Sequence, residues 1–284
     1  MTAGTALRID LHTHTTASDG LDTPAGLVSL ASQQGLSVLA ITDHDTLDAL
    51  DDAARAARTA GLTLVPGVEL STTVDRAEVH VLGYFVDRED DIFIGRLAEL
   101  AAARVRRVER MIDRLHKLGY PIDGDAILAE ADMGSIGRPH VARALIAIGA
   151  ADSVSDAFDR FLKAGRLAYI PRDPFSPEEA VRLLADHGAV PVLAHPYSTR
   201  DIPGILKRLV PVGLLGLETY YAEYKPEQHR DLRSIADKWG LTPTGGSDHH
   251  GKGFREGRDL GAAPVPGEVW ERLEALHRAR REQR

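Results

Sequence analysis

Short runs of consecutive apolar residues alternate with amphipathic segments along most of this chain. The run at 38–42, Val-Leu-Ala-Ile-Thr, is typical of a strand that is covered on both faces of a sheet. Similar runs at 62–68, 190–194 and 214–217 predict further buried strands. Because helical segments separate strands along the chain, the pattern predicts an α/β fold built on a parallel sheet.

The remaining strands and the helix starts complete the predicted order of elements. Further strands are expected at 9–11, 78–85 and 241–246. Thr23 precedes Pro24 as a helix N-cap, and the segment 176–179, Ser-Pro-Glu-Glu, forms a capping box with proline at the first helical position. Helices are therefore expected at 24–34, up to residue 60, from 177 onward, at 228–239 and at 268–280.

The alternation of strands and helices stops between residues 95 and 168, where every segment is typical of a helix. One apolar stripe of a long first helix is formed by Ile94, Leu97, Ala101, Val105, Val108, Ile112 and Leu115. The arginines on its other faces are expected to face solvent, and they are Arg104, Arg106, Arg107, Arg110 and Arg114. Shorter helices are predicted at 124–130, 139–148 and 154–163. We interpret residues 95–168 as an all-helical insertion carried on a barrel formed by 1–94 and 169–284.

Composition narrows the chemistry that the chain can use. A length of 284 residues suits a large α/β domain with an insertion, and 43% hydrophobic residues are ordinary for a globular protein. The chain has no cysteine, so a bound metal must be held by His, Asp and Glu. The net charge of −8 argues against binding of duplex DNA. The sequence has no signal-peptide core and no run of about 18 apolar residues, so a cytoplasmic protein with no membrane contact is expected. No obligate protein partner is evident from the sequence.

Nine histidines and carboxylates follow the predicted strands, lie within them or occupy the turn after the first strand. They are His12, His14, Asp19, His44, Glu69, His80, His195, Asp248 and His250. A single histidine after a strand is usually structural, and His12 with His14 alone is also compatible with two packed strand residues. The carboxyl ends of strands converge on one face of a β/α barrel, so nine such residues together favour a metal cluster.

Six motifs resemble those of the PHP (polymerase and histidinol phosphatase) domain family of the amidohydrolase superfamily. They are Asp10-Leu11-His12-Thr13-His14, Thr42-Asp43-His44, Gly67-Val68-Glu69, Glu78-Val79-His80, Ala194-His195-Pro196 and Gly246-Ser247-Asp248-His249-His250. The resemblance spans nearly the whole chain and implies a distorted (β/α)7 barrel that holds three divalent metal ions. It implies one metal held by His12, His14, Glu69 and Asp248, a second by Glu69, His80 and His195, and a third by Asp19, His44 and His250. His249 is not expected to be a ligand.

A cluster of this kind suits the hydrolysis of phosphate esters, because divalent cations lower the pKa of bound water and orient a phosphoryl group. Mn²⁺ is the expected metal, and Fe²⁺ and Zn²⁺ are alternatives that also suit histidine and carboxylate ligands. The candidate catalytic residues are His195 and His140, as acids that protonate the leaving oxygen, and Asp248 among the ligands.

The segment 137–140, Gly-Arg-Pro-His, precedes a predicted helix and has proline in the first turn of that helix. An arginine beside a helix N-terminus is suited to binding phosphate, although Arg138 can instead cap a neighbouring helix. Together with Tyr169 and Arg172, this segment resembles one branch of the PHP family. The branch contains the nucleoside 3′,5′-bisphosphate phosphatases and the related 5′→3′ exoribonucleases of the ribonuclease AM type.

This second resemblance implies a phosphorylated nucleotide as the substrate. The expected reaction is release of the 3′-phosphate from adenosine 3′,5′-bisphosphate, or removal of nucleotides from 5′-phosphorylated short RNA. Arg138, His140 and Arg172 would hold the phosphates, and Tyr169 would pack on a base or ribose. An insertion such as 95–168 would cover the mouth of the barrel and help to hold the substrate.

Three alternatives remain open. A histidinol-phosphate phosphatase would use the same cluster on a zwitterionic substrate, for which a second, arginine-rich phosphate site is less expected. A non-catalytic PHP module would have a structural role or would dock to a polymerase. Such a module would be expected to lack some of the metal ligands or to be attached to a polymerase. A carbon–nitrogen amidohydrolase would more often hold one or two metals.

Overall fold

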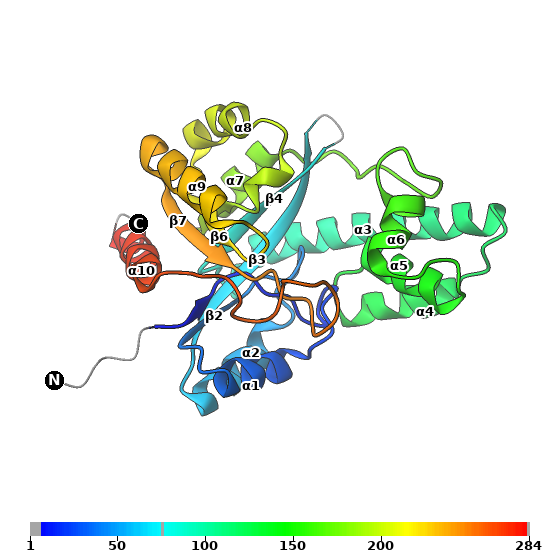
Figure 1. Ribbon diagram of the computed structural model, residues 1–284, viewed down its shortest axis with the longest axis horizontal. Helices are drawn as coiled ribbons and strands as arrows, with labels where there is room; N and C mark the ends of the chain where they lie inside the picture. Colours follow the sequence, from blue (N-terminus) through cyan, green and yellow to red (C-terminus); the bar gives the residue numbers. More distant parts are fainter. Residues whose placement is uncertain (1–6, 75–76, 283–284) are drawn as a thin grey trace.

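A single seven-stranded sheet lies at the centre of the computed structural model, which describes residues 7–74 and 77–282 (Figure 1). Its strands are β1 (Ile9–Asp10), β2 (Val38–Ile41), β3 (Thr63–Val74), β4 (Ala77–Tyr84), β5 (Val190–Leu193), β6 (Gly216–Tyr221) and β7 (Thr242–Gly246). Strands that are consecutive in sequence are neighbours in the sheet. After β1, Leu11 N–H donates to the carbonyl oxygen of Gly245 on β7 at 3.2 Å, so the sheet nearly closes into a barrel. The predicted distorted seven-stranded α/β barrel is confirmed.

The sheet is mixed, so the prediction of a parallel sheet is wrong at one strand. β4 runs antiparallel to both β3 and β5, whereas the other neighbouring strands pair in parallel. Val74, the last residue of β3, and Ala77, the first of β4, are three positions apart in the sequence, which is too short for the crossover that a parallel pair needs. β3 also continues beyond Glu69, which therefore lies within the strand and not at its end as predicted.

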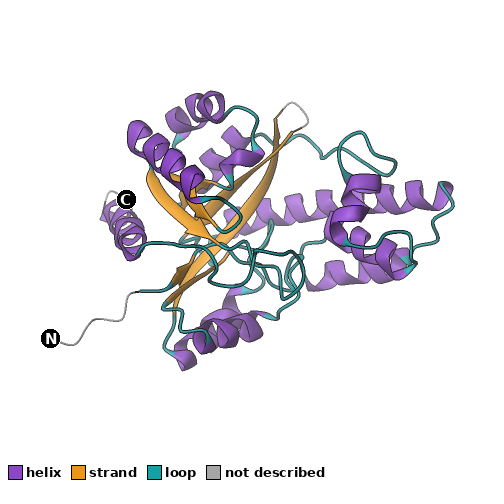
Figure 2. Cartoon of the chain, in the orientation of Figure 1, coloured by secondary structure: helices purple, strands orange, loops and turns teal. Residues whose placement is uncertain are grey.

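Helices outside the sheet cover the strands, as Figure 2 shows. They are α1 (Pro24–Gln33), α2 (Leu50–Ala60), α7 (Pro177–Asp186), α8 (Ile202–Leu209), α9 (Pro226–Trp239) and α10 (Gly267–Glu282), with short turns η3 (Pro196–Ser198) and η4 (Val210–Val212). Both predicted caps are confirmed: the Thr23 hydroxyl accepts a hydrogen bond from Gly26 N–H, and Ser176 and Glu179 form the reciprocal capping box. Within the described residues, none of the helices combines the length and the apolar character that crossing a bilayer requires.

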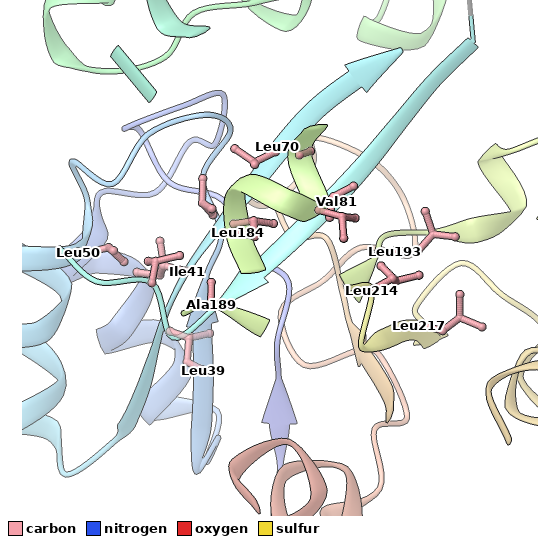
Figure 3. Packing of buried hydrophobic residues seen from close by; sticks show 14 of the residues in the cluster. Leu39, Ile41, Leu50, Leu70, Val81, Leu184, Ala189, Leu193, Leu214 and Leu217 are labelled. Atoms are coloured by element: carbon pink, nitrogen blue, oxygen red, sulfur yellow. The ribbon is translucent and has the colours of Figure 1, made fainter. Parts of the chain in front are cut away.

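The main hydrophobic core lies between the sheet and these helices (Figure 3). Leu39 and Ile41 of β2 and Val81 of β4 belong to it, and Leu184 of α7 packs against β4. α7 approaches β4 closely at Gly83, where an added Cβ atom would lie 2.3 Å from the Leu184 side chain. A larger residue at position 83 would have to displace the Leu184 side chain, so glycine allows α7 to pack closely on β4.

The segment between β4 and α7 is helical and projects from the barrel (Figure 1). It contains α3 (Asp91–Lys117), α4 (Gly124–Ala129), η1 (Glu130–Met133), α5 (Arg138–Ala147), α6 (Val154–Ala157) and the π-helical turn η2 (Phe158–Leu162). A second cluster of buried apolar residues, including Val108, Leu145 and Phe161, forms a core of its own there. Arg104 and Arg107 are buried, so the expectation that they face solvent is wrong. They turn toward the barrel, where carboxylates and carbonyl groups accept their hydrogen bonds.

Replacing Ser176 with alanine is expected to lower the free energy of unfolding by about 1 kcal/mol. The substitution removes the hydroxyl that accepts a hydrogen bond from Glu179 N–H at the start of α7. Urea denaturation followed by circular dichroism measures the loss. The matched control is Ser32→Ala on the exposed face of α1, which should be neutral or slightly stabilising. Equal losses in the two variants would contradict a capping role for Ser176.

Candidate metal centre

Glu69 lies at the centre of a group of imidazoles at one end of the barrel. Its carboxylate oxygens are 2.8 Å from His80 Nδ1, 3.0 Å from His195 Nε2, and 3.2 Å from one nitrogen of each of His12, His14 and His44. These histidines come from β4 and from the segments that follow β1, β2 and β5. The sheet therefore directs five histidines to one buried carboxylate.

Most of the other expected ligands lie in overlapping groups around this point. Three groups have ligand atoms within 4.8 Å of one another: His12, His14, Glu69 and Asp248; His44, Glu69 and His80; and His14, Asp19, His44 and His250. His195 is outside these groups but contacts Glu69. The backbone is unusual at two of the positions, because His195 and Asp248 have φ angles of +25° and +55°. Non-glycine residues adopt such angles at a cost, and they often do so at functional sites.

The three carboxylates of the cluster, Asp19, Glu69 and Asp248, are ionised although they are buried. Burial by itself would raise the pKa of each carboxyl group. Neighbouring positive charges outweigh burial, chiefly His250 at Asp19, His12 at Glu69 and Arg258 at Asp248. The pKa of each of the three carboxyl groups therefore lies well below its usual range, and each offers a negative oxygen to a cation.

The side chains fit divalent metal ions. The Nε2 atoms of His12, His14 and His80 are buried and have no hydrogen-bond partner among the described residues, although buried polar atoms are normally paired. Burial lowers the pKa of His14, but the adjacent Asp248 and Glu69 carboxylates raise it more, to about 10, so the site favours positive charge. Imidazole nitrogens and carboxylate oxygens are donors that suit Mn²⁺, Fe²⁺ and Zn²⁺.

Glu218 supports the cluster from behind, and sequence reasoning did not include it among the site residues. It lies within β6 and is fully buried. His12 Nδ1–H donates to one carboxylate oxygen at 2.9 Å, and His195 N–H donates to the other at 2.6 Å. The first bond orients the His12 ring with Nε2 toward Glu69 and Asp248. In the neutral imidazole, with the hydrogen on Nδ1, Nε2 would be free to bind a metal. Glu218 directly follows the apolar run 214–217, and this position after a predicted strand was the signal that could have identified it.

Replacing Glu218 with glutamine is expected to weaken metal binding about ten-fold. Glutamine offers one acceptor oxygen where Glu218 offers two, so either His12 or the backbone N–H of His195 loses its partner. Metal titration of the chelator-treated protein measures the change. Glu274→Gln on α10 is the control, because Glu274 lies outside the cluster and should leave metal binding unchanged. Unaltered metal affinity in the Glu218 variant would contradict this role.

A cleft of about 740 Å³ opens onto the cluster. Glu69, His80 and His195 contribute to its lining from the barrel, while Phe158 and Lys163 contribute from the helical segment. Figure 1 shows α5 and α6 to one side of the barrel. A volume of this size is typical of sites that bind small molecules.

The structure brings two of the four expected substrate-binding residues to the cleft. Arg138 and Arg172 both line it. His140 is buried elsewhere, where its Nδ1 atom accepts a hydrogen bond from Gly137 N–H at the start of α5. Tyr169 is half-buried beneath the Arg107 guanidinium, 6.0 Å from the ring centre, and neither His140 nor Tyr169 is among the residues that line the cleft. Of the two candidate acids, His195 faces the cleft and His140 does not.

Three further cleft residues, Arg104, Tyr221 and Arg258, were not identified from the sequence. Arg258 pairs with Asp248, and Tyr221 donates its hydroxyl hydrogen to the same carboxylate at 2.7 Å. Arg104 donates to Asp45 at 2.6 Å and to the hydroxyl of Ser71 at 2.8 Å. Arg258 lies in an irregular segment between β7 and α10, so no periodic pattern marked it.

Known proteins share both the sequence and the fold. The PHP domain model matches residues 10–105. The 5′-3′ exoribonuclease Rnm of Escherichia coli is 34% identical over 253 residues, which are 86% of this chain and 86% of that protein. The 3′,5′-nucleoside bisphosphate phosphatase of Chromobacterium violaceum is 30% identical and covers 94% of this chain and 96% of its own length.

A solved structure from Bifidobacterium adolescentis, described as a metal-dependent phosphoesterase, superimposes with a TM-score of 0.87. It is 35% identical, and the match covers 95% of this chain and 96% of that one. The match covers nearly the whole chain, so it includes both the barrel and the helical segment. The resemblance inferred from the six motifs is confirmed: the chain belongs to the PHP domain family.

Proposed function

We propose that this PHP protein, a metal-dependent phosphoesterase, removes the 3′-phosphate from nucleoside 3′,5′-bisphosphates such as adenosine 3′,5′-bisphosphate. The observation that carries the proposal is the presence of a ligand cluster and separate arginines in one cleft. Glu69 and His80 belong to the cluster, and Arg138 and Arg172 line the same cleft. A substrate with two phosphates suits this arrangement, because one phosphate can react at the cluster while guanidinium groups hold the other.

The proposal includes three divalent cations, of which Mn²⁺ is the first choice. The ligand sets are those implied by the family: His12, His14, Glu69 and Asp248; Glu69, His80 and His195; and Asp19, His44 and His250. When bound, such cations supply a nucleophile from water at neutral pH and offset negative charge on the phosphoryl oxygens. Arg138 and Arg172 would orient the substrate, and His195 and Asp248 are the catalytic candidates that line the cleft.

Removal of the first nucleotide from 5′-phosphorylated short RNA is the second candidate activity. Tyr197, whose surface is 38% exposed, and Phe158 both line the cleft and offer aromatic faces on which bases can stack. The E. coli relative is named for an exonucleolytic activity of this kind. In both reactions a non-reacting phosphate would lie against the arginines.

A comparison of four substrates tests the proposal. They are adenosine 3′,5′-bisphosphate, a 5′-phosphorylated oligoribonucleotide, histidinol phosphate and p-nitrophenyl phosphate. We expect the highest kcat/KM for the bisphosphate, with adenosine 5′-monophosphate and inorganic phosphate as products. The highest value for histidinol phosphate would contradict the proposal, and the highest value for the oligoribonucleotide would favour the exonuclease. A metal-loaded protein that hydrolyses none of them would support a docking module.

A further inference from the structure

Three arginines converge on the carboxylate of Glu78 at the wall of the cleft. Glu78 lies on β4, two residues before His80. Arg138 Nη2, at the start of α5, pairs with one carboxylate oxygen. Arg172 Nε lies 3.4 Å and Arg107 Nη2 lies 3.6 Å from the other oxygen. Glu78 thus joins the barrel to α3, to α5 and to the segment that leads into α7.

The three arginines differ in how firmly the surrounding structure holds them. Arg107 is buried, and its Nε–H donates to the carbonyl oxygen of Ile170 at 2.8 Å. Its Nη2 atom has no hydrogen-bond acceptor within residues 7–74 and 77–282, so the carboxylate of Glu78 supplies its nearby negative charge. Arg138 and Arg172 line the cleft, and their side chains are 15% and 13% exposed. Arg107 is therefore held inside the structure, whereas Arg138 and Arg172 reach the cleft.

Glu78 engages a single nitrogen of each cleft arginine, whereas a guanidinium group carries five N–H donors. Arg138 uses Nη2 and Arg172 uses Nε. Among the described residues, the remaining donors of these two groups have no acceptor, so they are available to a ligand in the cleft. Three guanidinium groups and one carboxylate together carry a net charge of +2 (three positive charges less one), which matches a phosphate monoester dianion.

We infer that Glu78 is a positioning residue that holds Arg138 and Arg172 in the orientation needed to bind the non-reacting phosphate of the substrate. This inference rests on the proposed function. Without the carboxylate, three guanidinium groups around one point repel one another in a partly buried environment. Because Arg107 is held by Ile170, the repulsion would displace Arg138 and Arg172 from the cleft wall. Arginines held in place before binding lose less side-chain freedom when the phosphate arrives.

The variant Glu78→Gln tests the inference, because it removes the charge and keeps the size of the side chain. We expect kcat/KM for adenosine 3′,5′-bisphosphate to fall about ten-fold, mainly through a higher KM. The Ki of adenosine 5′-monophosphate as an inhibitor should rise by a similar factor. Turnover of p-nitrophenyl phosphate, which has no second phosphate, should change much less. Glu78→Asp should partly restore the KM, since it restores the charge.

Two further variants distinguish positioning from a general structural effect. Asp173→Asn is the matched control: this exposed carboxylate pairs with Arg106 and Arg110 of α3, lies outside the cleft lining and should not affect the KM. In the double variant with Arg138→Ala, the Glu78→Gln substitution should add much less loss than it causes alone, because residues that act together are not additive.

The inference would be overturned if Glu78→Gln bound the bisphosphate or adenosine 5′-monophosphate as tightly as the wild type or more tightly, because the carboxylate would then only occupy the anion site. Equal losses on the bisphosphate and on p-nitrophenyl phosphate, or fully additive losses with Arg138→Ala, would overturn it as well. A wild-type enzyme that does not prefer the bisphosphate would instead count against the proposed function. In that case the Ki of adenosine 5′-monophosphate still decides the role of Glu78.

Discussion

Replacing Glu69 with glutamine is expected to lower kcat on the order of 1,000-fold and to reduce the metal content. Glu69 is the one proposed ligand that bridges two metals, and its oxygens contact five imidazoles. A neutral amide has nearly the same shape as the carboxylate but cannot offset the charge of two cations. Metal analysis by mass spectrometry and steady-state kinetics on adenosine 3′,5′-bisphosphate measure the two effects.

The control for this substitution is Glu89→Gln, which removes one charge from an exposed position outside the cluster. It should retain the metal content and activity of the wild type. Chelation of the wild-type protein should abolish activity, and added Mn²⁺ should restore it. A Glu69→Gln protein with full metal content and activity would refute the proposed bridge, and an active wild-type enzyme with one metal or none would refute the three-metal cluster.

The Arg138→Ala substitution should lower kcat/KM for a nucleoside bisphosphate about ten- to a hundred-fold, which corresponds to roughly 1.5–3 kcal/mol. The guanidinium lines the cleft and would hold the second phosphate by charge-assisted hydrogen bonds. A phosphomonoester without a second phosphate cannot use this binding, so its turnover should fall much less. Kinetics with adenosine 3′,5′-bisphosphate and p-nitrophenyl phosphate measure the difference.

Arg138 also has structural contacts, so a second measurement is needed. It pairs with Glu78, and its guanidinium lies 5.0 Å from the centre of the Phe158 ring. If these contacts were its main role, both substrates would lose activity equally and the melting temperature would drop. Arg96→Ala is the matched control, because Arg96 lies on α3 with a partly exposed side chain, pairs with Glu99 and lies outside the cleft lining. It should leave the ratio of the two activities unchanged.

The order of most elements and the identity of the family follow from the sequence alone. The buried strand β2 and the capped helices α1 and α7 formed at the predicted places, because apolar runs and caps act within a few residues. The cluster was also foreseeable, since histidines and carboxylates that follow barrel strands converge on one face. The local sequence pattern predicts where these strands, helices and ligands lie, and the barrel then brings the ligands together.

Other features depend on contacts between residues that are far apart in the chain. β4 pairs in an antiparallel direction because it returns directly beside β3, which the apolar pattern of either strand does not encode. Arg104 lies on a polar face of α3 and was expected to be exposed, but α3 packs against the barrel and Asp45 accepts its hydrogen bond. A polar residue can be buried where a distant residue accepts its hydrogen bonds, and the sequence around the polar residue does not reveal that partner.

The metal centre shows most clearly which features follow from the sequence and which depend on the tertiary structure. The residue types and their places after strands determined which side chains could bind metal. Only the tertiary structure decided which residues support the cluster and which line the cleft. In the tertiary structure Glu218 accepts a hydrogen bond from His12, and His140 accepts one from the backbone of Gly137 at the start of α5 and does not line the cleft. Ligand chemistry is a property of the side chain, whereas access to a cleft and the choice of hydrogen-bond partner are set by how the helical segment and the barrel pack together.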